Sequence, residues 1–259
     1  MYLRDVHAEK DLRVLRQLVR ENPLGMITTA IKSPHFPFLQ TSHIPFVLEV
    51  EDEESQTELG RLKGHLARAN PQSKAIIEEV NDRHTEDAVK ILENDVLVIF
   101  NSPIQSYSTP KFYTETKPST GKVVPTWNYA AVQIYGKATV YVDSKAAETS
   151  AFLDSQMRAL TYHNEVERMG YNGKGDNPGP WEVSDAPEKF IELLKKAIIG
   201  IDIKIEHMGG KFKMSQEMNT GDTEGIIKGF RNLGTEMGGK VADLVEERRD
   251  LKNKAKAET

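Results

Sequence analysis

The chain of 259 residues contains no cysteine. This absence excludes disulfides, thiolate metal sites and cysteine nucleophiles, and it is typical of a protein from a reducing compartment. The sequence also lacks any apolar run close to the roughly 18 residues that a membrane span requires. Charged residues occur in its first five positions, where a secretory signal would need an apolar segment. We therefore expect a cytoplasmic protein without a membrane segment.

An excess of positive charge is missing too, because 39 acidic residues outnumber 34 lysines and arginines and leave a formal net charge of −5. Sequence-independent binding to duplex DNA depends on many Lys and Arg contacts to phosphate. The charge balance therefore argues against direct DNA binding. The densest basic segment, residues 248–256, is interpreted as a solvated helix face or a frayed tail rather than a nucleic-acid arm.

The common catalytic sequence motifs are absent as well. The chain has no Gly-x-Gly-x-x-Gly, no P-loop, no His-Glu-x-x-His and no Gly-x-Ser-x-Gly. Its seven histidines are scattered without the spacing of metal ligands, so we predict no metal site. These patterns leave the catalytic residues, if there are any, unassigned.

Hydrophobic periodicity predicts an α+β protein. Alternating or continuous apolar runs indicate strands at residues 24–31, 38–50, 59–66, 95–101, 127–142 and 201–206. Strands and helices do not alternate regularly, so we expect a domain centred on a β-barrel. Gly136 predicts a bulge or a close backbone approach within the longest strand. Gly209-Gly210 predicts a turn after the last strand, and the acidic residues 51–55 predict a solvated hairpin loop.

The most informative segment joins a strand to a well-marked helix start, Gly64-His65-Leu66-Ala67-Arg68-Ala69-Asn70-Pro71-Gln72. Asn70 has the side chain of a good N-cap, and Pro71 suits the first helical position. A helix N-terminus exposes unpaired N–H groups and attracts anions. With His65 and Arg68 beside it, this segment is a candidate phosphate cradle. The alternative is a capped surface helix whose Arg68 is merely solvated.

A second cluster begins the longest strand, Val124-Pro125-Thr126-Trp127-Asn128-Tyr129. It combines an indole, an amide and a phenol after a proline-stiffened turn, as a site for a planar heterocyclic ligand requires. The alternative is a hydrophobic strand start that is buried in the core. His43 and His65 lie on neighbouring predicted strands, where their side chains could face one pocket.

Taken together, these segments resemble the PaiB-like family of FMN-binding negative transcriptional regulators. The similarity extends from Met1 to about Phe230, and the further motifs that carry it are Glu21-Asn22-Pro23-Leu24-Gly25, His43-Ile44-Pro45-Phe46, Val98-Ile99-Phe100, Tyr107-x-x-Pro110 and Lys211-Phe212-Lys213-Met214-Ser215-Gln216. The resemblance implies an FMN-binding split β-barrel with peripheral helices, which we assign to residues 1–234. A charged helical C-terminal extension follows over residues 235–259. The resemblance also implies a homodimer with two flavin sites at the subunit interface.

The resemblance assigns eleven residues to the FMN cofactor in three groups. Those that line the flavin ring and its phosphate from one strand are Thr41, Ser42, His43 and Ile44. Those that serve the ribityl phosphate are His65, Arg68, Asn70 and Gln72. Those that approach the ring, in one arrangement from the partner subunit, are Trp127, Asn128 and Tyr129. The chain departs from the family after Gln216, where relatives commonly continue with Asn-Arg and this chain has Glu217-Met218, so a positive charge is missing.

Three functions are compatible with this resemblance, because fold and family do not fix function. The first is a flavin-binding regulator, which would place the protein in the nucleus if it acts there. The second is a flavin-dependent oxidoreductase acting on a small molecule, since the cofactor itself carries the redox chemistry. The third is a haem-binding or haem-degrading protein on the same barrel, with His43, His65 or His207 as an axial ligand. A small-molecule substrate or effector is compatible with each of them.

Overall fold

The computed structural model describes residues 1–82 and 90–257, which contain ten β-strands and seven α-helices. The strands are β1 (Ala8–Glu9), β2 (Leu24–Ala30), β3 (Leu39–Pro45), β4 (Val47–Glu49), β5 (Arg61–Ala67), β6 (Lys90–Ile91), β7 (Val96–Asn101), β8 (Ser106–Ser108), β9 (Thr126–Tyr141) and β10 (Ile198–Lys213). The helices are α1 (Leu12–Glu21), α2 (Pro71–Asp82), α3 (Thr116–Thr120), α4 (Ala147–Tyr162), α5 (Glu188–Lys196), α6 (Thr220–Arg231) and α7 (Glu236–Ala257). The expected α+β class is confirmed. No helix in these two ranges is long and apolar enough to cross a membrane.

Contacts divide the chain into two compact units, each built from separate segments. The barrel unit comprises Asp11–Phe100 and Gln133–Met208. The terminal unit comprises Met1–Lys10, Asn101–Val132 and Gly209–Thr259. The helix expected beyond residue 234 is present as α7, and it packs on α6 within the terminal unit. The boundary that we placed after residue 234 stays a prediction.

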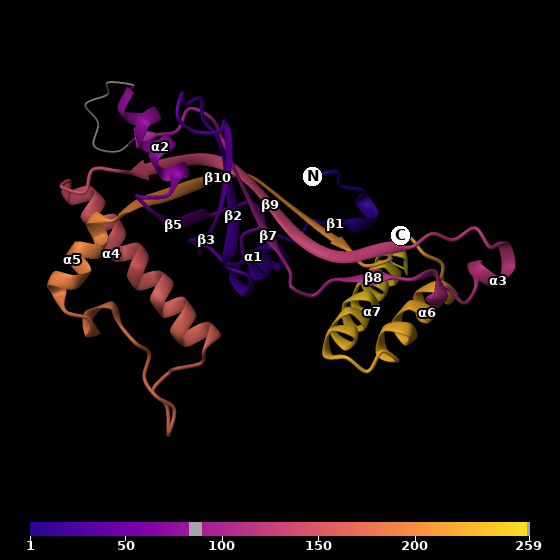
Figure 1. Cartoon of the computed structure of the whole chain (residues 1–259). Helices are drawn as coiled ribbons and strands as arrows, with labels where there is room; N and C mark the ends of the chain where they lie inside the picture. The colour runs from indigo at the N-terminus through magenta and orange to yellow at the C-terminus, as the bar shows by residue number, and fades with distance from the viewer. Residues whose placement is uncertain (83–89, 258–259) are drawn as a thin grey trace. The chain divides into compact units, whose positions relative to one another are not determined.

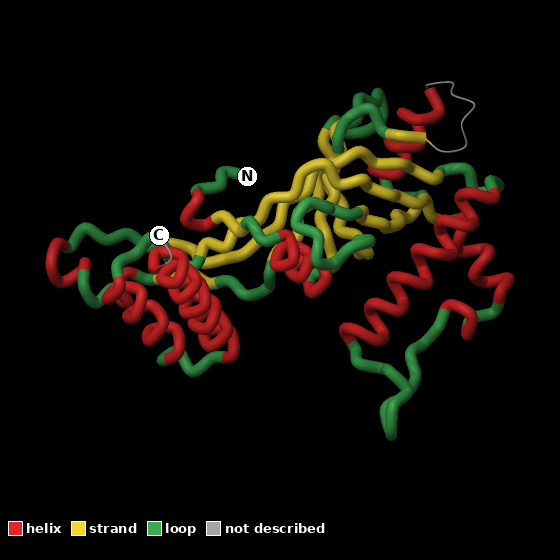
Figure 2. Tube along the Cα trace, turned by 180° about the vertical axis from the view of Figure 1, so that it is seen from behind, coloured by secondary structure: helices red, strands yellow, loops and turns green. Residues whose placement is uncertain are grey.

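The sheet of the barrel unit curls until its two ends meet. Its strand order is β3-β2-β7-β9-β10-β5-β4, so β3 and β4 are the first and last strands of this path. Only Phe46 separates β3 from β4 in the chain, and the strands can be followed around the curl in Figures 1 and 2. At this residue the chain leaves its pairing with β2 and begins to pair with β5. The single strand expected at residues 38–50 is therefore two strands.

Two glycines make room for the aromatic core of the barrel. Phe46 and Phe100 are buried and meet edge to face, with their ring centroids 6.0 Å apart. A Cβ atom added at Gly25 would lie 2.7 Å from the ring of Phe100, and one added at Gly64 would lie 3.0 Å from the ring of Phe46. Because core side chains interlock at the density of organic crystals, these positions accept only glycine while both rings stay in place.

The two longest strands contribute residues to both units. A Cβ atom at Gly136 of β9 would collide with the carbonyl oxygen of Lys204 on β10, which confirms the close backbone approach predicted there. The turn predicted at Gly209-Gly210 is wrong, because β10 continues to Lys213. The backbone of its last residues pairs with β1 in the terminal unit, where Gly210 is opposite Glu9. This pairing satisfies polar groups that a turn would have left to solvent.

The acidic loop after β4 is tethered to α1 rather than simply solvated. Arg16 is fully buried, and its guanidinium donates hydrogen bonds to the carbonyl oxygens of Glu53, at 3.0 Å, and Glu58. Arg20 forms an ion pair with the carboxylate of Glu53 at 2.5 Å. Two cations one helical turn apart therefore hold the loop against the helix.

Candidate functional site

Asn70 connects the start of α2 to strand β3. Its side-chain Oδ1 accepts a hydrogen bond from the backbone N–H of Gln72 at 2.9 Å, which confirms the N-cap predicted from the sequence. Its Nδ2 donates to Oγ of Ser42 at 2.9 Å. One side chain therefore both caps the helix and links its N-terminal end, which favours anions, to the middle of β3.

Strand β3 presents its two faces differently. Thr41 and His43 are exposed, and Oγ1 of Thr41 lies 2.9 Å from Oγ1 of Thr28 on the neighbouring strand β2. Ile44 is buried, and its side chain packs beside Gly64 inside the barrel. Ile44 is one of the four residues of β3 that we assigned to the flavin. Because its side chain points into the barrel, only its backbone groups could contact a ligand.

Gln72 fixes the position of α2 over β2 and β3 from a buried site. Its Nε2 lies 3.0 Å from Oγ1 of Thr29, 3.0 Å from the carbonyl oxygen of Gln40 and 3.2 Å from that of Ile27. We call Ser42, Asn70 and the start of α2 the junction. Two buried atoms beside it, Oε1 of Gln72 and Nε2 of Gln40, have no hydrogen-bond partner among the residues that the structure describes. Since buried polar groups are normally paired, hydrogen-bonding capacity remains at this place.

His65 forms its hydrogen bond with helix α4 and not with the residues of the junction. Its Nδ1 lies 2.7 Å from Oε1 of Gln156, so Nδ1 carries the proton when the amide oxygen accepts. Gln156 is buried, and its Nε2 has no partner within the described part of the chain. This bond holds the imidazole in one orientation, and no sequence pattern pointed to Gln156.

Arg68 connects the end of β5 to the residue after β9, to the end of α5 and to the start of β10. Its Nη2 donates to the carbonyl oxygens of Val142, at 2.7 Å, and Ile198, at 3.3 Å. Its Nε donates to that of Lys196 at 3.3 Å. The side chain is thus not merely solvated, because three N–H groups bind backbone carbonyls. Nη1 has no such bond within residues 1–82 and 90–257, so this end of the guanidinium can still meet an anion.

The other three assigned residues belong to the terminal unit. Trp127 is 49% exposed, and its Nε1 donates to Oε1 of Gln105 at 3.1 Å. The ring of Tyr129 lies under the ammonium of Lys211, 5.5 Å from the ring centroid. Asn128 is fully buried, and its Oδ1 accepts from Oγ of Ser215 at 2.9 Å. Trp127 and Tyr129 thus present rings at the surface of this unit, whereas the Asn128 side chain points into it.

Ser215 lies in one of the family motifs, but no sequence pattern assigned it a role at the site. It is buried and has a backbone φ of 61°, a conformation that residues other than glycine adopt only at a cost in free energy. Its hydroxyl binds Asn128, whose Nδ2 has no partner among the described residues. The strained backbone and the bond to Asn128 together fix the start of β9, which carries Trp127.

Glu217, which precedes the position of the missing family arginine, is the centre of a half-buried network. Its carboxylate accepts from Nε2 of His7 at 2.9 Å and lies 3.6 Å from the ammonium of Lys213. Burial by itself favours the neutral acid, but the bond from His7, a backbone N–H and the charge of Lys213 outweigh it and lower the pKa of Glu217. The network therefore carries its own compensating charges.

The charged C-terminal helix is not a purely solvated face. Arg248 is buried, pairs with Glu9 and stacks on the ring of Phe212 at 3.9 Å from the centroid. Lys252 donates to the carbonyl oxygen of Gln216 at 2.5 Å. Our interpretation of residues 248–256 is therefore wrong for these two positions. They fix α7 to the rest of the terminal unit.

Only some of the eleven residues assigned to FMN are linked to one another in the structure. Ser42, Asn70 and Gln72 are linked by hydrogen bonds in the barrel unit, while His65 and Arg68 bond to other elements of that unit. Trp127, Asn128 and Tyr129 lie in the terminal unit. Within the described ranges, no group of three or more His, Asp or Glu side chains could hold a metal ion.

Comparison with known proteins agrees with the resemblance stated above. Residues 1–207 match a family model described as "Putative FMN-binding domain". Uncharacterized proteins of Aspergillus fumigatus and Emericella nidulans are 57% and 53% identical to the chain, and each match covers 98% of this chain and all of the relative. The protease synthase and sporulation protein PAI 2 of Bacillus subtilis is 26% identical, over 96% of this chain and 98% of that protein. The chain therefore belongs to the FMN-binding domain family.

Proposed function

We propose that this member of the FMN-binding family is a homodimeric flavoprotein with a regulatory role, and that its barrel unit holds the cofactor. The observation that carries the proposal is the hydrogen-bonded junction of Ser42, Asn70 and the start of α2. This junction combines a capped helix N-terminus with an exposed strand face, and both suit a ligand that has a phosphate and a planar ring.

The residues present fit an FMN molecule. Two buried polar atoms, on Gln72 and Gln40, have no partner within the described chain, and a flavin ring has both donors and acceptors to offer. Nη1 of Arg68 and the N-terminus of α2 supply positive potential for the phosphate. A bound FMN would supply hydride and electron transfer, which none of the protein's own side chains provides. The protein's contribution is to orient the ring and to balance the phosphate charge.

Exposed apolar side chains of the terminal unit support the homodimer. Trp127 and Tyr107 are 49% and 50% exposed and meet edge to face, with their ring centroids 6.4 Å apart. Val124, just before β9, is 73% exposed. Apolar clusters of this kind mark binding surfaces on soluble proteins. In a homodimer they would cover a flavin held by the partner subunit and lose their contact with water.

Absorption spectroscopy combined with light scattering tests this proposal. We expect the purified protein to show the visible bands of a flavin after incubation with FMN, and a mass of twice the 29.1 kDa of one chain. A monomer at micromolar concentration, or a protein that binds riboflavin as well as it binds FMN, would contradict it. A haem-like spectrum after incubation with haem, without any flavin binding, would support the haem alternative instead.

Assays of DNA binding and turnover separate a regulator from an oxidoreductase. Because the protein has a net charge of −5, we expect it not to bind duplex DNA directly at physiological salt. Regulation would then act through a small molecule or another protein. A sequence-specific complex that becomes stronger as salt falls would contradict this expectation. Steady oxidation of a nicotinamide donor by the FMN-loaded protein, with a small-molecule acceptor, would favour the oxidoreductase.

A further inference from the structure

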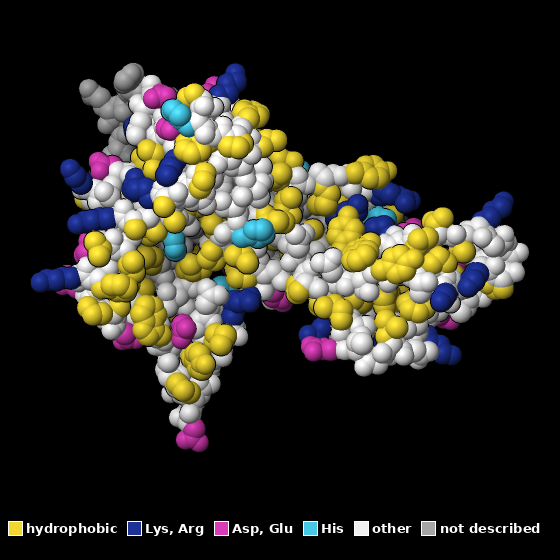
Figure 3. Space-filling model, in the orientation of Figure 1, with side chains coloured by type: hydrophobic (Ala, Val, Ile, Leu, Met, Phe, Trp, Pro, Cys, Tyr) yellow, Lys and Arg dark blue, Asp and Glu magenta, His cyan; other side chains and the backbone are white. Residues whose placement is uncertain are grey.

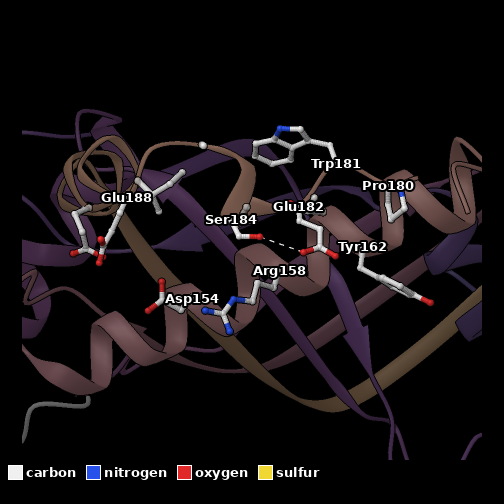
Figure 4. A pocket seen from close by; sticks show the side chains of 13 residues that line it. Asp154, Arg158, Tyr162, Pro180, Trp181, Glu182, Ser184 and Glu188 are labelled. Carbon is white, nitrogen blue, oxygen red and sulfur yellow. Dashed lines mark hydrogen bonds between the residues drawn. The ribbon is translucent and has the colours of Figure 1, made fainter. Parts of the chain in front are cut away.

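A cavity of about 770 Å³ lies within the barrel unit, between α4 and the segment of residues 180–192. Its volume is within the range of small-molecule sites, about 300–1,000 Å³. None of the eleven residues assigned to the flavin lines it. Figure 4 shows Asp154 and Arg158 of α4 opposite Glu182 and Ser184, while the ring of Tyr162 points away from that of Trp181.

Negative charge predominates around this cavity. Its carboxylates belong to Asp154, Glu182, Glu188 and Glu192, and its single guanidinium belongs to Arg158. Asp154 and Glu192 share the buried ammonium of Lys195, at 2.9 and 2.8 Å. Within the described residues, neither Glu188 nor Glu182 has such a cation, and Glu182 accepts from neutral donors, the hydroxyl of Ser184 at 3.2 Å and the backbone N–H of Asp185. The four carboxylates therefore outnumber the two cations even when Lys195 is included.

Aromatic side chains add a second feature that favours cations. Trp181 is 47% exposed and Tyr162 is 59% exposed, and both line the cavity. The faces of such rings attract cations, and the indole is the best of them. In addition, the hydrophobic side chains of Phe190, Leu193 and Leu194 are exposed along α5, next to this cavity (Figure 3). A phosphate-bearing ligand such as FMN does not suit this site, because the surrounding charge is of the same sign.

We propose that this cavity is a second ligand site, distinct from the flavin site, which binds a small organic ammonium ion. The carboxylates of Glu182 and Glu188 balance the ligand's charge, and Trp181 and Tyr162 contact its apolar body. Such a ligand would be an amine effector or substrate of the protein. This site rests on its own residues and does not depend on the flavin proposal.

The two tryptophans of the chain allow a direct test. In the Trp127→Phe variant, Trp181 is the only tryptophan, so its fluorescence reports on the cavity. We expect saturable binding of benzyltrimethylammonium, detected by calorimetry and by a matching change in Trp181 fluorescence. Benzyl alcohol and benzoate should bind at least about tenfold more weakly, because they lack the positive charge. Equal or tighter binding of benzoate would overturn the proposal, as would calorimetric binding that leaves Trp181 unaffected.

Charge variants sharpen this test. Glu188→Gln should weaken benzyltrimethylammonium binding about three- to tenfold, whereas Arg158→Gln should strengthen it about two- to fivefold, since these side chains attract and repel the ligand. The matched control is Glu148→Gln, which removes the same charge from an exposed residue of α4 outside the cavity. Equal effects of the Glu148 and Glu188 substitutions would show a nonspecific response to net charge and overturn the site. All three positions are exposed, and thermal unfolding by circular dichroism verifies that each variant folds.

Discussion

Both units pack a pair of aromatic rings against glycine, Phe112 and Phe230 being the pair of the terminal unit, but in the terminal unit a buried carboxylate that accepts backbone N–H groups also joins separate segments. Phe46 and Phe100 fill the barrel above Gly25 and Gly64. In the terminal unit, Arg248 pairs with Glu9 and the carboxylate of Asp222 caps two backbone N–H groups. Both units use residues of β9 and β10, so the difference lies in what packs against these strands.

The comparison teaches which changes each unit should respond to. A core packed by shape loses stability when volume is removed, because a cavity remains. A unit held by buried carboxylates and cations loses stability when one of these groups changes its charge, because its partner is then left without compensation. Both units should therefore be sensitive to side-chain size, and the terminal unit should in addition lose stability as the pH falls, because the pKa values of Asp222 and Glu217 are lowered.

Phe46→Ala should have the largest effect. We expect the free energy of unfolding to fall by about 3–5 kcal/mol, the usual cost of truncating a buried phenylalanine. Urea unfolding followed by circular dichroism measures this change. Phe38→Ala is the matched control, since Phe38 is 51% exposed and its loss should cost less than about 0.5 kcal/mol. Similar costs for both variants would contradict our account of the barrel core.

Arg68→Ala should weaken FMN binding by about 1.5–3 kcal/mol, as expected for a lost charge-assisted hydrogen bond to phosphate. Riboflavin, which has no phosphate, is the control ligand, and its affinity should hardly change. The variant should also be less stable, because Arg68 binds three backbone carbonyls. Equal losses of affinity for FMN and riboflavin would mean that Arg68 supports the fold and does not meet the phosphate.

Asp222→Asn should reduce stability at pH 7 by about 1–2 kcal/mol, because the charge-assisted hydrogen bonds that its carboxylate accepts from Glu115 and Thr116 become neutral ones. Burial favours the neutral acid, but bonds from Thr116, Glu115 and Asn219 outweigh it and lower the pKa of Asp222. A lowered pKa stabilises the fold above the unfolded value of about 3.9, and this contribution is lost as the pH falls through the folded pKa.

The difference in stability between wild type and Asp222→Asn should therefore shrink below about pH 4. Unfolding curves at a series of pH values measure it. Asp243→Asn is the control, because this carboxyl is 71% exposed and pairs with Arg231 only at the surface. A difference that is constant down to pH 2 would show that the carboxylate's charge does not stabilise the terminal unit.

Trp127→Ala should have the smallest effect on affinity, because the phosphate contacts keep the flavin bound. We expect a shifted absorption band or an altered reduction rate of bound FMN, since the ring's surroundings change. Trp181→Ala is the matched control in the barrel unit and should leave the flavin spectrum unchanged. A flavin spectrum that responds to Trp181 and not to Trp127 would reverse our assignment of the two tryptophans.

Several features could be predicted from the sequence because they depend on neighbours along the chain. The N-cap at Asn70 needs only the backbone of the next residues, and the alternation along β5 reports which face is buried. The run of strand-forming residues predicted β9, and Gly136 predicted its close approach to another strand. The order of the family motifs identified the flavin-binding family, which the family model confirms.

Other features were decided by the tertiary structure alone. The three carbonyl partners of Arg68, the bond from Ser215 to Asn128 and the pairing of Arg248 with Glu9 join residues that are far apart in sequence. A side chain's type limits which bonds it can make, but the fold determines which partners come within 3 Å of it. Whether a polar residue faces a ligand or supports its own backbone is therefore settled only when distant strands and helices pack together.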